Sequence, residues 1–202
     1  DLKTARRSMN LLTIEWANRG VNMWTIDEGF VNLGQGTATY NLPADTIDLL
    51  EQVIRTNEGS TTLQTDLNLS RISVDNYASI PNKLTQGRPI QCWIDRLRDQ
   101  PTITVWPIPD QGTVGVPYYV VRYWRLRRIQ DAGAGVQTPD MPFRFFPALV
   151  AGLAYYIATK LPEGMPRLEM LKAQYDEQYT LAAGEDREKA SEMLIPRLYG
   201  PR

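Results

Sequence analysis

The sequence contains no histidine and only one cysteine in 202 residues. Histidine is the commonest general base and metal ligand in proteins, so its absence excludes most familiar catalytic and metal sites. The single cysteine, Cys92, excludes a disulfide framework within the chain and any zinc site built from several cysteines. Without a histidine to activate it, we expect Cys92 to be buried and inert.

Neither sign of charge dominates, and no long apolar run is present. The formal net charge is −1, which argues against a general nucleic-acid binder with a basic overall field. The longest apolar run, residues 143–157, is interrupted by Arg144 and Pro147 and is too short to cross a bilayer, so we expect no membrane partner. With 43% hydrophobic and 22% charged residues, the chain has the composition of a globular protein with a proper core.

Residues 87–110 predict a β-hairpin that carries two tryptophans. Apolar and polar residues alternate over 90–95 and again over 102–106, which is the period-two pattern of strands. Residues 98–101 supply the turn, and Pro107 ends the second strand because proline cannot donate a ladder hydrogen bond. A chain that devotes this much sequence to rigid scaffold, without a visible active site, indicates a structural or interaction protein.

Helical periodicity marks the two ends of the chain. Apolar residues recur every three or four positions over 1–19 and 167–183, so we expect an amphipathic helix over each of these ranges, and a third helix is expected over 143–160. The 143–160 segment is apolar on most sides and is therefore expected to be the central, buried helix. A brief helix is expected after Ser73, whose side chain is a favoured N-cap.

The middle of the chain changes to strand-like patterns. Besides the hairpin, strands are expected over residues 24–30, 37–42 and 116–127. A turn at residues 34–36 is expected to reverse the chain, so that the strand over 37–42 runs back from the strand over 24–30. Residues 47–55 fit a strand because Val53 and Ile54 are β-branched, although Leu49-Leu50-Glu51 leaves a short helix open.

The sequence therefore predicts an α+β fold. The N-terminal helix and the two C-terminal helices form a small bundle, beside a mostly antiparallel sheet region. Residues 1–184 form the core, with the strand region inserted at about 21–128, and residues 185–202 form an extended C-terminal tail. The chain opens at Asp1 without a methionine, already inside a helical pattern, so we expect a short upstream segment.

The tail combines apolar side chains with prolines that forbid a stable helix. Its apolar members are Met193, Leu194, Ile195, Leu198 and Tyr199, and its prolines are Pro196 and Pro201. An extended apolar terminus needs shelter, either on its own core or on a partner. We favour a partner, because extended peptides dock in grooves and along sheet edges, with Arg197 and Arg202 adding charge-assisted contacts.

Arginines alternate with aromatic residues near the end of the last strand. The group comprises Arg122, Tyr123, Trp124, Arg125, Arg127 and Arg128. Stacking and phosphate contacts use these residue types, so a nucleic-acid-binding module stays open. We favour a strand whose arginines pair with acids on a neighbouring strand, because the net charge is near zero.

Carboxylates leave one enzymatic alternative. Glu15 and the pair Asp95 and Asp99 are candidates for a cell-wall glycosidase, whose chemistry needs two carboxyl groups at the right separation. Nothing in the sequence places them in a cleft, and exposed acids are abundant in any protein. We therefore expect no reaction and no cofactor.

The order of motifs resembles the head-to-tail adaptor family of short-tailed phages, also called tail accessory or head completion factors. Characteristic pieces are Trp93-Ile94-Asp95-Arg96, Val105-Trp106-Pro107-Ile108-Pro109-Asp110 and Ile195-Pro196-Arg197. Further matching pieces lie at residues 1–12, 15–20, 40–43, 71–77, 87–89, 127–131 and 142–144. Together they run through nearly the whole chain.

The resemblance implies a virion structural protein at the head–tail junction, assembled in the host cytoplasm. It implies a ring, usually of twelve copies, bound beneath the portal protein, which extends the channel for the passing DNA and offers a platform to the tail nozzle or other tail proteins. The residues implied to dock on the portal are Met193, Leu194, Ile195, Pro196, Arg197, Leu198 and Tyr199. Candidates for contacts between subunits are Trp93, Asp95, Arg96, Trp106, Arg125 and Arg127.

Overall fold

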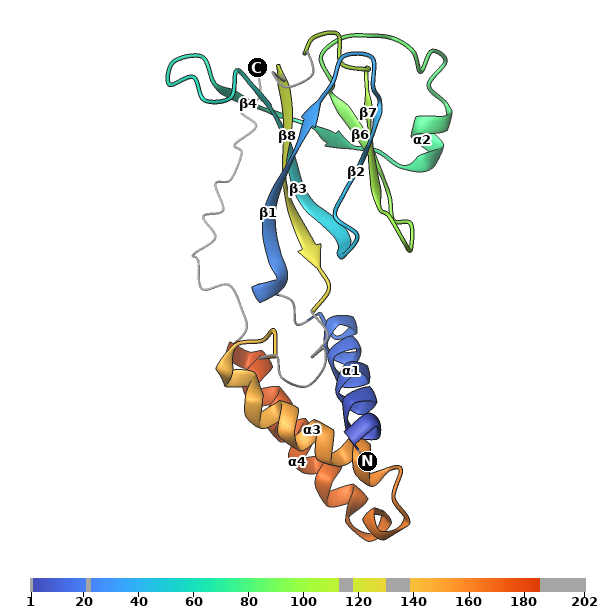
Figure 1. Ribbon diagram of the computed structural model, residues 1–202, viewed down its shortest axis with the longest axis vertical. Coiled ribbons are helices and arrows are strands. Elements are labelled where there is room, and N and C mark those ends of the chain that lie inside the picture. The colour runs from blue at the N-terminus through green and yellow to red at the C-terminus, as the bar shows by residue number, and fades with distance from the viewer. Residues whose placement is uncertain (1, 21–22, 113–117, 130–138, 186–202) are drawn as a thin grey trace, which may run out of the picture. The chain divides into compact units, whose positions relative to one another are not determined.

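The computed structural model describes residues 2–20, 23–112, 118–129 and 139–185. These residues form two compact units. The described residues of 1–23 and 131–202 make a helical unit, and those of 24–130 make a strand unit (Figure 1). The fold is α+β, as predicted, but the strands form two sheets instead of one.

The first sheet has the strand order β1-β8-β3-β4, and every neighbouring pair is antiparallel. Its strands are β1 (Ile26–Leu33), β8 (Tyr119–Arg127), β3 (Thr46–Thr56) and β4 (Thr65–Asn68). A 3-10 turn, η1 (Met23–Thr25), precedes β1. The strand alternative for residues 47–55 is thus confirmed.

The second sheet has the order β2-β7-β6-β5 and contains the predicted hairpin. Its strands are β2 (Thr39–Asn41), β7 (Thr102–Trp106), β6 (Gln91–Asp95) and β5 (Ser70–Arg71). β6 and β7 pair antiparallel, whereas β5 lies parallel to β6. Between β5 and β6 lies the short helix α2 (Val74–Ala78), whose N-cap is Ser73, as predicted.

The turn at residues 34–36 does not close a hairpin between β1 and β2, which corrects the expectation from the sequence. β1 pairs with β8, and β2 pairs with β7 in the other sheet. The turn instead donates backbone hydrogen bonds to another loop, from Gln35 to Gly112 and from Gly36 to Pro109. Gly36 has a φ of 77°, a left-handed conformation that favours glycine. The chain therefore crosses from one sheet to the other at this point.

The two sheets pack face to face around one apolar cluster. Its buried members are Leu33, Leu42, Leu49, Ile54, Leu69, Cys92, Ile94, Ile103, Val105, Tyr119, Val121 and Tyr123. Cys92 and Ile94 point into it from β6, as the period-two pattern predicts. Cys92 is buried, as predicted, and burial raises the pKa of its thiol to about 12.

The helical unit contains α1 (Leu2–Asn18), α3 (Phe146–Ala158) and α4 (Leu168–Glu185). Short 3-10 segments, η2 (Phe143–Phe145) and η3 (Pro162–Arg167), precede α3 and α4. α3 packs against both α1 and α4, and the three helices meet at Gly152. A Cβ atom there would lie 2.8 Å from a methyl of Leu12 and 2.9 Å from the ring of Tyr175.

α3 is central but not buried on most sides, contrary to the expectation. α1 and α4 cover two of its sides, where Ala148, Leu149 and Gly152 are buried. The remaining side carries Phe146, which is 38% exposed, and Val150, which is 67% exposed. Hydrophobicity alone does not say how many neighbours a helix has, and within the described residues α3 keeps an uncovered apolar face.

Candidate assembly surfaces

The two hairpin tryptophans predicted as subunit contacts hold a segment of their own chain. The Trp93 ring stacks on Tyr77 of α2, with 5.4 Å between ring centroids and 22° between the planes. The Trp106 indole nitrogen donates a hydrogen bond to the carbonyl of Asn82 at 3.1 Å. Both side chains remain half-buried, so each keeps part of its ring at the surface of the strand unit.

The other two hairpin candidates lie near the β6–β7 turn. Asp95 is half-buried at the end of β6. The Arg96 side chain is 63% exposed and reaches Asp48 at 3.4 Å. Leu97, the next residue, is also exposed. This end of the hairpin therefore presents a cation and an apolar side chain to the solvent.

The arginines of β8 are split between the two faces of their sheet. Arg125 lies directly opposite Asp27 of β1 and also pairs with Asp45, while Arg127 reaches Asp27 at 2.9 Å. These hydrogen bonds from Arg125, more than any other effect, lower the pKa of Asp45 below its ordinary value.

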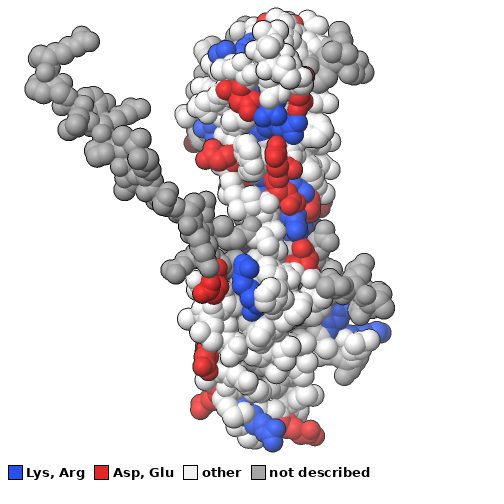
Figure 2. Space-filling view, turned by 90° about the vertical axis from the view of Figure 1, so that its left-hand side faces the viewer, with Lys and Arg blue, Asp and Glu red and all other residues white. Residues whose placement is uncertain are grey.

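Arg122 points to the opposite face, because side chains alternate along a strand. There it pairs with Glu28 and Glu58, and its guanidinium lies 5.0 Å from the centroid of the Phe30 ring. Acidic and basic side chains are accordingly interspersed over the strand unit, in the upper part of Figure 2. The interpretation that the arginines pair with acids is confirmed for Arg122, Arg125 and Arg127, which therefore do not form one basic surface. Arg128 instead donates a hydrogen bond to the carbonyl of Arg98.

Glu15, the first glycosidase candidate, lies in a polar network between the helices. Its carboxylate accepts hydrogen bonds from Tyr156 of α3 at 2.6 Å and from Tyr175 of α4 at 3.2 Å, and it pairs with Arg19. Burial, together with Glu15, raises the pKa of Tyr156 to about 12. The partners of Glu15 are thus phenols and a guanidinium, which suit a structural carboxylate.

The proposed carboxylates are divided between the two structural units. Glu15 belongs to the helical unit, whereas Asp95 and Asp99 belong to the strand unit. The Asp99 side chain is almost fully exposed in the hairpin turn, beside Arg98. Among the described residues, no cluster of three or more acidic or cysteine side chains is placed to hold a metal ion.

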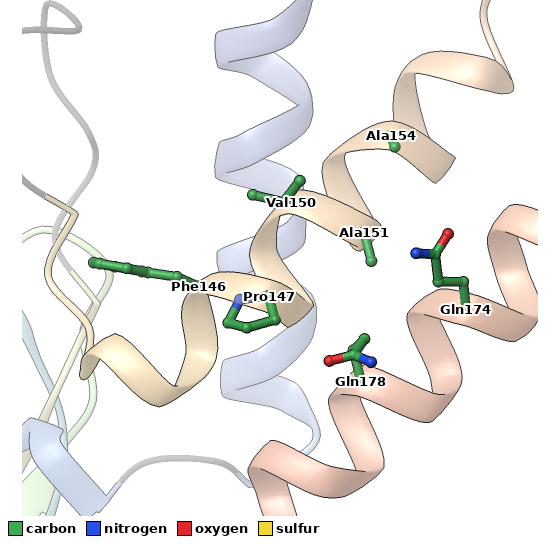
Figure 3. A pocket seen from close by; sticks show the side chains of 7 residues that line it. All are labelled: Phe146, Pro147, Val150, Ala151, Ala154, Gln174 and Gln178. Atoms are coloured by element: carbon green, nitrogen blue, oxygen red, sulfur yellow. The ribbon is translucent and has the colours of Figure 1, made fainter.

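A groove of about 550 Å³ lies between α3 and α4, and the sequence analysis did not predict it. Its lining residues are Phe146, Pro147, Val150, Ala151, Ala154, Gln174 and Gln178. Figure 3 shows both glutamines extending from α4 toward α3. The sequence does show that the thirteen residues of α3 include no charged side chain, but that feature fits a buried helix as well as one that lines a groove.

The predicted portal-docking residues, Met193 to Tyr199, lie outside the described residues. None of the described helices is both long and apolar enough to cross a bilayer.

One family model, described as SU10 adaptor protein, matches residues 2–197. No match was found among curated proteins. The matched range spans both structural units and extends into the predicted tail as far as Arg197.

Proposed function

Since this chain belongs to the SU10 adaptor protein family, a family of phage head-to-tail adaptors, we propose that it forms a ring under the portal of a phage head. The ring extends the DNA channel and carries the tail proteins that attach next. The observation that carries this proposal is the family match over residues 2–197. The proposed role is structural: the protein joins other proteins and catalyses no reaction. A composition without histidine also favours such a role.

A ring follows from how identical subunits join. When one surface of a subunit binds a different surface of the next, the contact repeats until the rotation closes. We propose twelve copies, the number set by the portal on which the ring assembles. The helical unit, with its three helices as a small bundle, gives each copy a rigid body for such contacts.

The C-terminal tail is proposed to dock on the portal. The family match includes Met193, Leu194 and Ile195, so the apolar part of the tail belongs to the family pattern. Pro196 keeps this segment from continuing as a regular helix, which suits an extended peptide bound in a groove. The charge of Arg197 adds hydrogen bonds to acidic or carbonyl groups of the portal.

The tryptophan hairpin is proposed as a second contact region, either between copies or toward the tail. Arg96 and Leu97 are its most accessible described side chains. Arg125 and Arg127 are largely buried in ion pairs, so their part in an interface is to hold β1 and β8 in place. The same ion pairs leave weakly interacting surfaces, which suits a subunit past which DNA must move.

The proposal is tested by mixing the purified chain with the portal protein of the same phage and measuring the mass of the complex by native mass spectrometry. We expect a portal carrying twelve copies. Replacing Met193, Leu194, Ile195 and Leu198 with serine should abolish portal binding, whereas Leu84→Ser, at an exposed residue of the strand unit, should not. Undiminished binding by the variant with serines in the tail contradicts the docking role of the tail. Failure of the natural chain to bind the portal at all contradicts the proposed function.

A further inference from the structure

The outward side of α3 carries exposed apolar residues in its N-terminal half. Phe146 and Val150 of α3 are exposed, as is Phe143 in the preceding η2, and Ala154 lies one turn beyond Val150. α3 carries no charged residue that could solvate this face. Contiguous apolar surface of this kind on a soluble protein marks a site of interaction. The helical unit, in the lower part of Figure 2, presents a largely uncharged face.

α4 extends this surface on the other side of the groove. Met170, Gln174, Gln178 and Leu181 follow one another at intervals of four, four and three residues, so they share one face of α4. Met170 and Leu181 are both about 60% exposed. The two glutamines line the groove between them (Figure 3). The groove is thus long, apolar along its floor and open to a helix or an extended chain.

A second exposed apolar surface lies on α1. Leu11 and Ile14 are 43% and 57% exposed, and Arg7, one turn before Leu11, shares their face. Leu12 and Trp16, on the opposite side of the same helix, are fully buried. One face of α1 therefore packs against the other helices of its own unit, and the opposite face is exposed.

The charges of the two helices are complementary. α1 carries three basic side chains, Lys3, Arg6 and Arg7, and its single acid, Glu15, is already paired with Arg19. α4 carries four acidic side chains and one basic side chain, which are Glu169, Asp176, Glu177, Glu185 and Lys172. A contact of α1 with α1, or of α4 with α4, would bring like charges together. A contact of α1 with α4 is attractive.

We infer that the outward face of α1 in one copy of this chain lies in the α3–α4 groove of the next copy. The inference rests on the proposed ring and names its contact surfaces. Leu11 and Ile14 pack against Phe146, Val150 and Ala154, and the basic N-terminal half of α1 lies along acidic α4. The binding mode is an amphipathic helix in an apolar groove. Because every copy offers one helix face and one groove, the contact is head-to-tail and can close into a ring.

The test uses cysteine pairs in the full chain assembled on the portal. A chain with both Leu11→Cys and Val150→Cys, treated with a short bismaleimide, should give a ladder of covalent dimers, trimers and higher oligomers. The chains with Leu11→Cys alone or Val150→Cys alone are the matched controls and should stay uncrosslinked. Cys92 is buried, so we expect it not to react with the bismaleimide in any of the three chains.

Outcomes separate this inference from the proposed function. Rings of the expected mass that yield no ladder overturn the inference and leave the ring intact. Dimers from either single-cysteine chain show a symmetric contact and also overturn it. Portals that recruit no ring at all overturn the proposed function, and the inference with it.

A charge substitution gives an independent readout. Val150→Asp should weaken assembly at least tenfold, because it places a carboxylate in the groove beside acidic α4. Leu84→Asp, at a residue of the strand unit that is also highly exposed, is the control and should assemble normally. Circular dichroism verifies that both variants are folded. Equal assembly of the two variants overturns the inference.

Discussion

The indole nitrogen of Trp16 donates a hydrogen bond to the hydroxyl of Tyr175 at 2.9 Å, although the two residues are 159 positions apart in the chain. The same hydroxyl donates to Glu15 at 3.2 Å, and Tyr156 donates to that carboxylate at 2.6 Å. α1, α3 and α4 are therefore joined by one partly buried polar network as well as by apolar packing. Such networks fix the register of helices because each member needs its partner.

Tyr175→Phe tests this network. The change leaves the Trp16 indole N–H without its acceptor in a buried position, and Glu15 loses one donor. We expect the free energy of unfolding to fall by about 1–3 kcal/mol, the cost of an unsatisfied buried polar group. Urea unfolding followed by tryptophan fluorescence measures the change.

Tyr155→Phe is the matched control. The Tyr155 ring stacks on Tyr175, with 6.3 Å between centroids, but the described residues give its hydroxyl no hydrogen bond. Its replacement should change the free energy of unfolding by less than about 0.5 kcal/mol. Equal effects of the two replacements would mean that the Tyr175 hydroxyl does not matter.

Asp45 gives the strand unit a pH-dependent stability. Hydrogen bonds from Arg125 lower the pKa of Asp45 below its ordinary value of 3.8, so the folded state favours the ionised form. A lowered pKa stabilises the fold above the ordinary value, and this stability is lost as the pH falls through 3.8 toward the folded-state pKa. Asp45→Asn should therefore destabilise the chain at pH 7, and the difference from the natural chain should shrink below pH 4.

Denaturant unfolding at a series of pH values between 2 and 7 measures this difference. Asp99→Asn is the control, because Asp99 is almost fully exposed and its contact with Arg98 lies in the same solvent-exposed turn. We expect Asp99→Asn to change the free energy of unfolding at pH 7 by less than about 0.5 kcal/mol. An Asp45→Asn difference that stays constant from pH 7 to pH 2 would rule out the ion pair as its cause.

The fold was predictable wherever one local pattern decided it. Period-two alternation placed β6 and β7, and the 3.6-residue period placed α1 and α4 with the correct faces inward. The exchange of β2 into the second sheet was not predictable, because it depends on hydrogen bonds from residues 35 and 36 to a loop more than seventy positions later. Local periodicity carries no information on which distant strand becomes the neighbour.

The assembly surfaces were predictable only in part. Trp93 and Trp106 were correctly placed on the hairpin, but the sequence does not reveal that Tyr77 and Asn82 contact them. The apolar face of α3 was interpreted as buried because composition gives hydrophobicity and not the number of neighbouring helices.

Cys92 should not react in the folded protein. It is buried in the core between the two sheets, and burial raises its thiol pKa to about 12, so neither access nor thiolate is available at neutral pH. Labelling with a chromogenic disulfide reagent should give no thiol in the native chain and one in 6 M guanidinium chloride. The unfolded chain is its own control. Rapid labelling under native conditions would contradict the buried placement.

Gly152 is expected to be required for the close packing of the three helices. Alanine favours a helix over glycine by about 1 kcal/mol, so the replacement would stabilise an open position. At Gly152 a Cβ atom would lie 2.8 Å from Leu12 and 2.9 Å from Tyr175, which are themselves buried. Because neither side chain has room to move away, we expect Gly152→Ala to cost about 1–3 kcal/mol, as overpacking does in other cores.

Gly184→Ala supplies the opposite expectation in α4. No atom lies within 4 Å of the Cβ position there, so the helix preference of alanine should stabilise this variant slightly. The melting temperature should therefore fall for Gly152→Ala and rise slightly for Gly184→Ala.

A double variant tests the steric cost at Gly152 directly. Leu12→Ala combined with Gly152→Ala should lower the free energy of unfolding by less than the sum of the two separate changes. If the two changes in the free energy of unfolding simply added, Leu12 and the side chain at position 152 would not be in steric contact.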